Sequence, residues 1–263
     1  MFRYLLIAFC SLFIISCDED IQEEEYLVES NDNLFPKGFF SNRYFVNESL
    51  PDYNFDSIQI KYDDQKRPIE KNIKSFHYIM SSQKVKYTND SLYEISEGGV
   101  IIEKGTYQVK NYFKEKIIQK LTSTKDKINT KYVYSAIEGD SVLDSVKIEK
   151  GKILEIQKYY WNRNSNYPHL TNLDSIEIRQ INKADSTDHS NARNVLSFYK
   201  YDKKQNPFIR LGIFDDINYR HLSFNNFILV NMKLYDKEDK IIYNHDFSPT
   251  KFYYKNGKVD LTK

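Results

Sequence analysis

Apolar and polar residues alternate along most of the chain after residue 56. The alternation is clearest in runs that open with the dipeptide Asp-Ser, at Asp56, Asp90, Asp144 and Asp174. In three of these runs the apolar positions lie two residues apart: Ile58, Ile60 and Tyr62; Val146 and Ile148; Ile176 and Ile178. A period of two is typical of a β-strand with one buried face. We therefore expect a strand in each run, preceded by a turn that the Asp and Ser side chains cap.

Recurring turn sequences separate the runs. In three of them an aromatic residue ends a strand, Asp opens a turn, and an apolar residue resumes: YDDQKRPI (62–69), YDKKQNPF (201–208) and YDKEDKII (235–242). Three shorter ones contain Gly, which permits tight turns: YYKNGKV (253–259), EKGTY (103–107) and EKGKI (149–153). Short turns between consecutive strands predict antiparallel hairpins in series, with roughly ten to fourteen strands.

Two stretches are less regular. Residues 111–127 (NYFKEKIIQKLTSTKDK) fit either a helix or a hairpin, while 181–194 (INKADSTDHSNARN) lack periodicity and predict an exposed loop or a boundary. The abundance of Tyr and Phe, 22 and 17 residues, favours strands throughout. The predicted fold is all-β, a serial antiparallel meander of hairpins that forms a large curved sheet or half-barrel-like body over residues 51–263.

The first residues have a different pattern. Arg3 is the only charge before an uncharged, mostly apolar run from Leu5 to Ile15, and acids follow from Asp18. A membrane-spanning helix needs about 20 apolar residues, so this run is too short. A buried core helix is also disfavoured, because no apolar residue continues the run past Cys17. These proportions predict a secretory signal peptide over residues 1–16.

The residues before Cys17 are Ile14, Ile15 and Ser16, which resemble a bacterial lipobox. The resemblance implies cleavage after Ser16 and a lipid on the Cys17 sulfur, which would anchor the protein durably in a membrane. Residues 17–50 then form the lipidated Cys and an acidic tether. The acids at 18–25 resemble the export signal of Bacteroidota lipoproteins that reach the cell surface. We expect an outer-membrane location, on the cell surface or the periplasmic face.

Composition narrows the possible chemistry. The chain has 38 basic and 37 acidic residues, and no cluster of Lys and Arg with aromatics suggests nucleic-acid binding. It has two cysteines, one in the signal peptide and one at the lipid site, so the mature body has no disulfide, cysteine nucleophile or Cys-based metal site. No phosphate-binding loop, dinucleotide fingerprint or EF-hand loop is present, and we expect no cofactor.

The turn sequences resemble a family. The YD hairpins, the stretch FNNFILVNMKLYD (224–236) and the closing FYYKNGKV (252–259) are similar to uncharacterised Bacteroidota lipoproteins with YD-like β-hairpin repeats, grouped as a domain of unknown function. The similarity covers about residues 50–260, but Pro68, Pro207 or charged residues stand where Gly is common in such repeats. The resemblance implies an exported all-β fold and carries over no catalytic residues.

Candidate sites are few. None of the five histidines, His77, His169, His189, His221 and His245, lies at metal-ligand spacing from another ligand, and we expect no metal site. A glycoside hydrolase needs two carboxylates across a cleft, and most Asp residues here are explained by turns. The stretch 158–170 gathers aromatics that fit either strand packing or a weak ligand platform for glycans: Tyr159, Tyr160, Trp161 and Tyr167.

The sequence leaves three functions open. The first is an outer-membrane-anchored lipoprotein with a non-enzymatic binding or structural role, contacting a glycan or an envelope protein. The second is an accessory to envelope assembly that presents a β edge to a partner chain. The third is a carbohydrate hydrolase whose site residues are distant in sequence. In all three the protein contacts the membrane through the lipid on Cys17 and does not bind nucleic acid.

Overall fold

The computed structural model describes most of the predicted body. The described residues are 36, 38–40, 57–74, 79–88, 91–112, 115–137, 139–164, 167–184, 193–214, 219–247, 254–255 and 258–259. They all belong to one compact unit, Asn31–Lys263. The predicted signal peptide, Cys17 and most of the tether lie outside the described residues. In the described part, no helix is long and apolar enough to cross a membrane.

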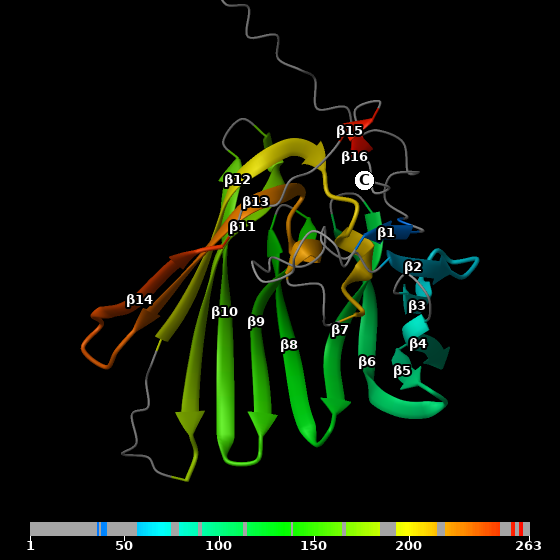
Figure 1. The fold of residues 1–263 in the computed structure, drawn as a ribbon, viewed down its shortest axis with the longest axis horizontal. Helices are drawn as coiled ribbons and strands as arrows, with labels where there is room; N and C mark the ends of the chain where they lie inside the picture. The colour runs from blue at the N-terminus through cyan, green and yellow to red at the C-terminus, as the bar shows by residue number, and fades with distance from the viewer. Residues whose placement is uncertain are drawn as a thin grey trace, which may run out of the picture. The chain divides into compact units, whose positions relative to one another are not determined.

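Within the described ranges, fourteen strands form one antiparallel sheet in which every strand pairs with its neighbours in sequence (Figure 1). The first seven are β1 (Gly38–Phe40), β2 (Ser57–Tyr62), β3 (Pro68–Lys74), β4 (Ile79–Thr88), β5 (Leu92–Glu97), β6 (Val100–Tyr112) and β7 (Glu115–Lys125). The others are β8 (Ile128–Ile137), β9 (Asp140–Lys150), β10 (Ile153–Asn164), β11 (Tyr167–Asn182), β12 (Arg193–Gln205), β13 (Asn225–Tyr235) and β14 (Ile241–Asp246). A separate hairpin pairs β15 (Tyr254–Lys255) with β16 (Lys258–Val259).

The predicted all-β meander in a curved sheet is therefore confirmed. Residues 115–125 of the ambiguous stretch form a strand, β7, and the turns after Tyr62 and Tyr235 are hairpins as expected. Of the loop predicted at 181–194, residues 181–182 belong to the end of β11 and 193–194 to the start of β12, while 185–192 lie outside the described part. The meander forms because each short turn lets a strand pair at once with the one before it.

The alternating apolar residues face the core as predicted. Ile58, Ile60, Val146 and Ile176 are at most 3% exposed. The buried side chains form two clusters, the first over β2–β7 and the second over β9–β13. The face of each strand that carries these residues is therefore the buried face of the curved sheet.

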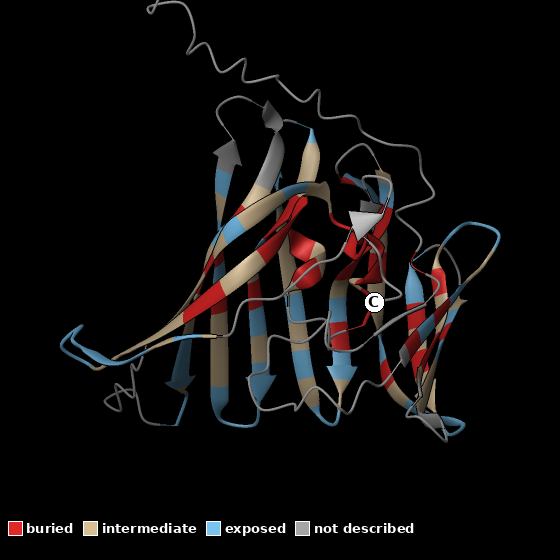
Figure 2. Ribbon diagram, turned by 45° about the horizontal axis from the view of Figure 1, so that its top comes forward, coloured by how far each residue is buried: buried red, intermediate tan, exposed pale blue. Residues whose placement is uncertain are grey.

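A long connection between β12 and β13 completes both clusters. This connecting segment, residues 206–224, is described over 206–214 and 219–224 and contains two single-turn 3₁₀ helices, η3 (Ile209–Leu211) and η4 (Arg220–Leu222). Phe208 and Phe214 pack in the first cluster and Leu222 in the second. Figure 2 shows the buried helical turns against the strands. The hairpin predicted at 201–208 is therefore wrong: β12 runs to Gln205, and a buried segment follows instead of a return strand.

Asn206 fixes the two ends of the connecting segment together. Its backbone N–H donates to Phe224 O at 2.7 Å, and its side-chain Nδ2 donates to Ser223 O at 2.8 Å. Its Oδ1 accepts the N–H of Phe208 at 2.9 Å. The 1% exposed amide thus satisfies buried backbone groups that an apolar residue would leave unpaired.

Three other predicted turns are also wrong. Asp144 and Asp174 lie inside β9 and β11, where the register with the preceding strand shifts across each Asp, so each is the extra residue of a β-bulge. Gly105 lies inside β6, and the turn before this strand is made by Gly98 and Gly99, both with positive φ. A Cβ on Gly105 would lie 2.0 Å from Thr122 O, so this glycine permits close approach of two backbones.

The inner face also buries charge. Lys120 Nζ lies 2.7 Å from Glu103 Oε1, and the two side chains are 2% and 3% exposed. The Tyr93 hydroxyl donates to the same carboxylate oxygen at 2.5 Å. These two charges in the strand pattern are therefore accommodated by pairing across the sheet, which offsets the cost of burying them.

Candidate functional site: a basic pocket

The turn between β2 and β3 presents basic side chains. Asp63 builds this turn: its Oδ1 accepts the N–H of Arg67 at 2.8 Å, and its backbone O accepts the N–H of Lys66 at 2.9 Å. Lys66 adopts a left-handed conformation, φ 62°, which reverses the chain. Gln65, Lys66 and Arg67 are consequently held at the tip of the hairpin.

The Arg67 guanidinium is fixed from several sides. Its Nε lies 2.7 Å from Asp63 Oδ2, and its Cζ lies 4.4 Å from the centre of the Tyr87 ring. Its Nη1 donates to the Tyr107 hydroxyl at 3.4 Å. An ion pair, a cation–π contact and a hydrogen bond together limit the positions that this side chain can take.

The connecting segment supplies a second arginine to the same place. Arg210, in η3, donates from Nη1 to Lys116 O at 2.8 Å and from Nη2 to Glu115 Oε2 at 2.5 Å. Arg210 is 7% exposed. The start of β7 and the connecting segment are thus joined through this guanidinium, although residues 115 and 210 are 95 positions apart.

These elements enclose a pocket of about 200 Å³. Its lining combines cationic and amide side chains with apolar ones: Gln65, Lys66, Arg67, Pro68, Val109, Lys116, Ile117, Ile118 and Arg210. Asp63 and Glu115 bind the two arginines but do not line the pocket. We call these nine residues the basic pocket.

The two arginines of the basic pocket keep their charge at neutral pH. For Arg67, partial burial lowers the pKa, but the hydrogen bond and the charge of Asp63 outweigh it, and the pKa is raised. Burial lowers the pKa of Arg210, and the nearby Glu115 carboxylate opposes that shift. Because the ordinary pKa of arginine lies far above neutral pH, both guanidiniums stay positive. The pocket can therefore attract and hydrogen-bond an anion.

The aromatic stretch expected to contact a ligand does not form one surface. Tyr159 is 7% exposed and belongs to the second core cluster, and the neighbouring Tyr160 is 46% exposed. Trp161 packs against the same cluster and donates from Nε1 to Leu143 O at 2.8 Å. Consecutive strand residues point to opposite faces, which separates Tyr160 from the other two. Tyr167 begins the next strand, and its side chain lies outside the described part.

Two of the five histidines have side chains in the described part of the chain. His221 lies in η4 and His245 in β14, while the side chains of the other three fall outside the described part. Among the described residues, no three His, Cys, Asp or Glu side chains are grouped so as to hold a metal ion.

Sequence reasoning missed the basic pocket for a physical reason. It treated 62–69 and 201–208 as two copies of one turn, whereas the residues after Asn206 cross to the hairpin at Tyr62. The local signal was the basic tip QKRP (65–68). Arg210 had no signal in the local sequence, because its position depends on how the connecting segment packs.

Comparison with known proteins assigns no family. No family model matches the chain, and no curated protein matches it. Among solved structures, the chain is similar to a porin-like protein from Bacteroides uniformis, with a TM-score of 0.39 and 10% sequence identity over 81% of this chain and 89% of that one. Similarity at this level supports no functional argument, and the resemblance to YD-repeat lipoproteins stays a prediction.

Proposed function

We propose that this protein is a lipid-anchored, non-enzymatic binding protein of the outer membrane that holds a small anionic ligand in the basic pocket. The anchor is the predicted lipid on Cys17. The observation that carries the binding role is a pocket lined by four cationic side chains and no carboxylate: Lys66, Arg67, Lys116 and Arg210.

The pocket lining indicates the kind of ligand. Guanidinium groups match the geometry of carboxylate and phosphate oxygens. Pro68, Val109, Ile117 and Ile118 offer an apolar wall beside the cations. A volume of about 200 Å³ is smaller than the roughly 300–1,000 Å³ of sites for drug-sized molecules. A single acidic sugar unit, with one anionic group and a C–H face, has the matching chemistry.

The same lining favours binding over hydrolysis. A glycoside hydrolase positions a carboxylic acid and a carboxylate on either side of the bond that breaks. The nine residues of the basic pocket include no Asp, Glu or His that could act as a general acid or base at neutral pH. The cations there can orient and neutralise an anion without reacting with it.

The binding role is tested by calorimetric titration of the full-length protein in detergent with glucuronate, glucose and inorganic phosphate. We expect the two anions to bind and glucose not to bind. Lys66→Asn, which keeps a residue tolerant of the left-handed backbone, and Lys116→Gln should each weaken binding about fivefold, because each removes one ionic contact worth about 1 kcal/mol. Lys158→Gln, at an exposed position on β10, is the charge-matched control. Equal binding of glucose, or no effect of the two pocket variants, would refute the role.

The anchor is tested separately. Cys17→Ala should release the protein from membranes and abolish labelling by radioactive palmitate. Protease digestion of intact cells then distinguishes the two faces of the outer membrane, since only a surface-exposed body is cleaved before lysis. Unchanged membrane association of Cys17→Ala would contradict the anchor while leaving the pocket untouched.

A further inference from the structure

A row of basic side chains crosses the outer face of the sheet, which is the face opposite the two buried clusters. The register places the following residues opposite one another on five neighbouring strands, from β8 to β12: Lys131, Lys147, Ile156, Arg179 and Arg193. Their sequence neighbours Tyr132, Val146 and Ile178 pack in the second cluster. Because consecutive strand residues point to opposite faces, the row points away from the core.

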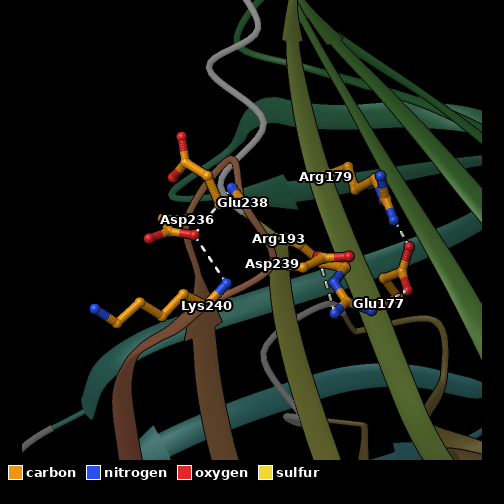
Figure 3. A network of polar contacts seen from close by, with 7 residues as sticks. All are labelled: Glu177, Arg179, Arg193, Asp236, Glu238, Asp239 and Lys240. Carbon is orange, nitrogen blue, oxygen red and sulfur yellow. Dashed lines mark hydrogen bonds and ion pairs between the residues drawn. The ribbon is translucent and has the colours of Figure 1, made fainter.

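At one end of this row, two basic residues share an acidic partner (Figure 3). Arg179 and Arg193 lie directly opposite each other. Glu177 contacts both, since its Oε1 lies 2.6 Å from Arg179 Nε and its Oε2 lies 3.4 Å from Arg193 Nη1. Asp239 Oδ1 lies 3.2 Å from Arg193 Nη2. Like charges directly opposite in a sheet repel each other, and here two carboxylates offset that repulsion.

At the other end, Lys131 and Lys147, here called the lysine pair, also lie directly opposite each other, and both are exposed. The Cβ atoms of directly opposite residues are about 4.5–5.5 Å apart. Among the described residues, none forms an ion pair with either lysine. Glu149, the next residue on this face of β9, instead lies 3.1 Å from Lys183 Nζ. The lysine pair therefore retains a repulsion that an anion from outside the chain would offset.

We infer that the lysine pair binds a carboxylate of an acidic glycan chain that lies across strands β8 to β11. The carboxylate lies between the two ammonium groups, as Glu177 lies between two arginines. Arg179, whose side chain is 50% exposed, is two strands from Lys147, or about 9–10 Å. Its guanidinium has further donors for a second acidic group. Because one sugar unit does not span this distance, the ligand is a chain.

The rest of the row fits a glycan better than a nucleic acid. Thr122 lies opposite Lys131 and is exposed, so its hydroxyl continues the row on β7. Ile156, between Lys147 and Arg179, offers an apolar contact for the C–H groups of a sugar ring. From Thr122 to Arg179 the row has no aromatic side chain, whereas proteins commonly bind single-stranded nucleic acids by stacking aromatic side chains on the bases. The glycan assignment also rests on the predicted export of the protein, but not on the basic pocket, with which the row shares no residue.

The site is tested by calorimetric titration of the full-length protein in detergent with polygalacturonate and with its neutral methyl ester. We expect the acidic chain alone to bind. Lys131→Gln/Lys147→Gln should weaken this binding about twentyfold, because it removes two ionic contacts, and should leave the glucuronate titration of the basic pocket unchanged. Lys84→Gln/Lys86→Gln, at exposed positions on β4, removes the same charge elsewhere and is the control.

The outcomes separate this site from the basic pocket. Unchanged polygalacturonate binding by Lys131→Gln/Lys147→Gln, or an equal loss in the control, would overturn the role of the lysine pair. A single-stranded oligonucleotide that binds as tightly as polygalacturonate would overturn the glycan assignment. If the unaltered protein binds polygalacturonate but not glucuronate, the basic pocket fails and the lysine pair stands.

A second measurement separates binding from stability. Lys131→Glu replaces the repulsive pair by an opposite-charge pair across β8 and β9, and such pairs stabilise a sheet. We expect its urea midpoint to lie above that of the unaltered protein, while its binding of polygalacturonate is weaker than that of Lys131→Gln. Circular dichroism checks that the variant keeps its strand content. A midpoint below that of the unaltered protein would show that Lys131 and Lys147 do not repel each other, and unchanged binding would show that they do not contact the glycan.

Discussion

Breaking the buried pair of Lys120 and Glu103 tests how this sheet tolerates charge in its core. The variant Lys120→Met removes the ammonium group and leaves the Glu103 carboxylate, 3% exposed, with the Tyr93 hydroxyl still donating to it. At an effective dielectric constant of about 20, unit charges 2.7 Å apart attract by about 6 kcal/mol. Desolvation of both groups offsets much of this attraction. Loss of one partner from a buried pair therefore destabilises by about 3–5 kcal/mol.

Removing both charges should cost far less than removing one. In Glu103→Gln/Lys120→Met the buried side chain at 103 is neutral, and its amide oxygen can still accept from Tyr93. We expect the double variant to recover at least about 2 kcal/mol of the stability lost in Lys120→Met, as coupled neighbours do. The exposed pair Lys61–Glu70, in which Lys61 is 64% exposed, is the matched control: Lys61→Met should cost about 1 kcal/mol or less.

Urea unfolding measures all of these variants. The single tryptophan, Trp161, packs on the second core cluster and reports loss of the fold by fluorescence, with circular dichroism as a second probe. With a slope of about 3 kcal/mol per molar urea, the midpoint of Lys120→Met should fall by about 1 M or more. If Lys120→Met shifts the midpoint no more than Lys61→Met, Glu103 is not a buried charge that depends on Lys120, and the reasoning fails.

Two further predictions concern the backbone and the tyrosines. Gly105→Ala should lower the free energy of unfolding by about 2 kcal/mol or more, because its Cβ would meet Thr122 O, whereas Gly151→Asn, at φ 57° with open space around it, should change it little; the same urea titration compares them. Burial raises the pKa of the hydroxyls of Tyr62, Tyr87 and Tyr134 above the ordinary value of 10.0, so the unfolded chain loses these protons at lower pH than the folded chain. The free energy of unfolding should therefore be unaffected by these groups below pH 10 and fall as the pH rises above it. In a pH titration, the tyrosinate absorbance of the folded protein should appear at higher pH than that of a denatured sample. A fall in stability that begins well below pH 10 would show that other groups control alkaline unfolding.

The faces of the strands could be predicted from sequence because a strand period is local. Ile58, Ile60 and Val146 each face the core as their spacing requires. Any register that buried the polar residues between them would expose these side chains to water, so packing reinforces the local pattern. Serial pairing follows from the short turns for the same reason, and the curved antiparallel meander can therefore be predicted from the sequence.

Turns were less predictable, because turn-forming residues also serve inside strands. Asp-Ser at 144 and 174 marks β-bulges, in which an extra residue bends the strand without reversing it. Gly105 is explained by a backbone on the neighbouring strand, 17 positions away at Thr122. A window of a few residues contains no information about such a neighbour. The dipeptide Asp-Ser therefore forms a bulge where the partner strand continues past it, and a turn only where the partner strand ends.

The basic pocket was less predictable than the strands or the turns, since it exists only after the connecting segment has packed. The tip of the β2–β3 hairpin is a local structure and would form in any similar turn. Arg210 reaches it because Phe208, Leu211 and Phe214 bury themselves in the first cluster, which fixes η3 above β7. A related chain could keep every hairpin and still lose the pocket if this segment were shorter. The meander thus depends on local hairpins, whereas the proposed binding role depends on one nonlocal contact, between Arg210 and the start of β7.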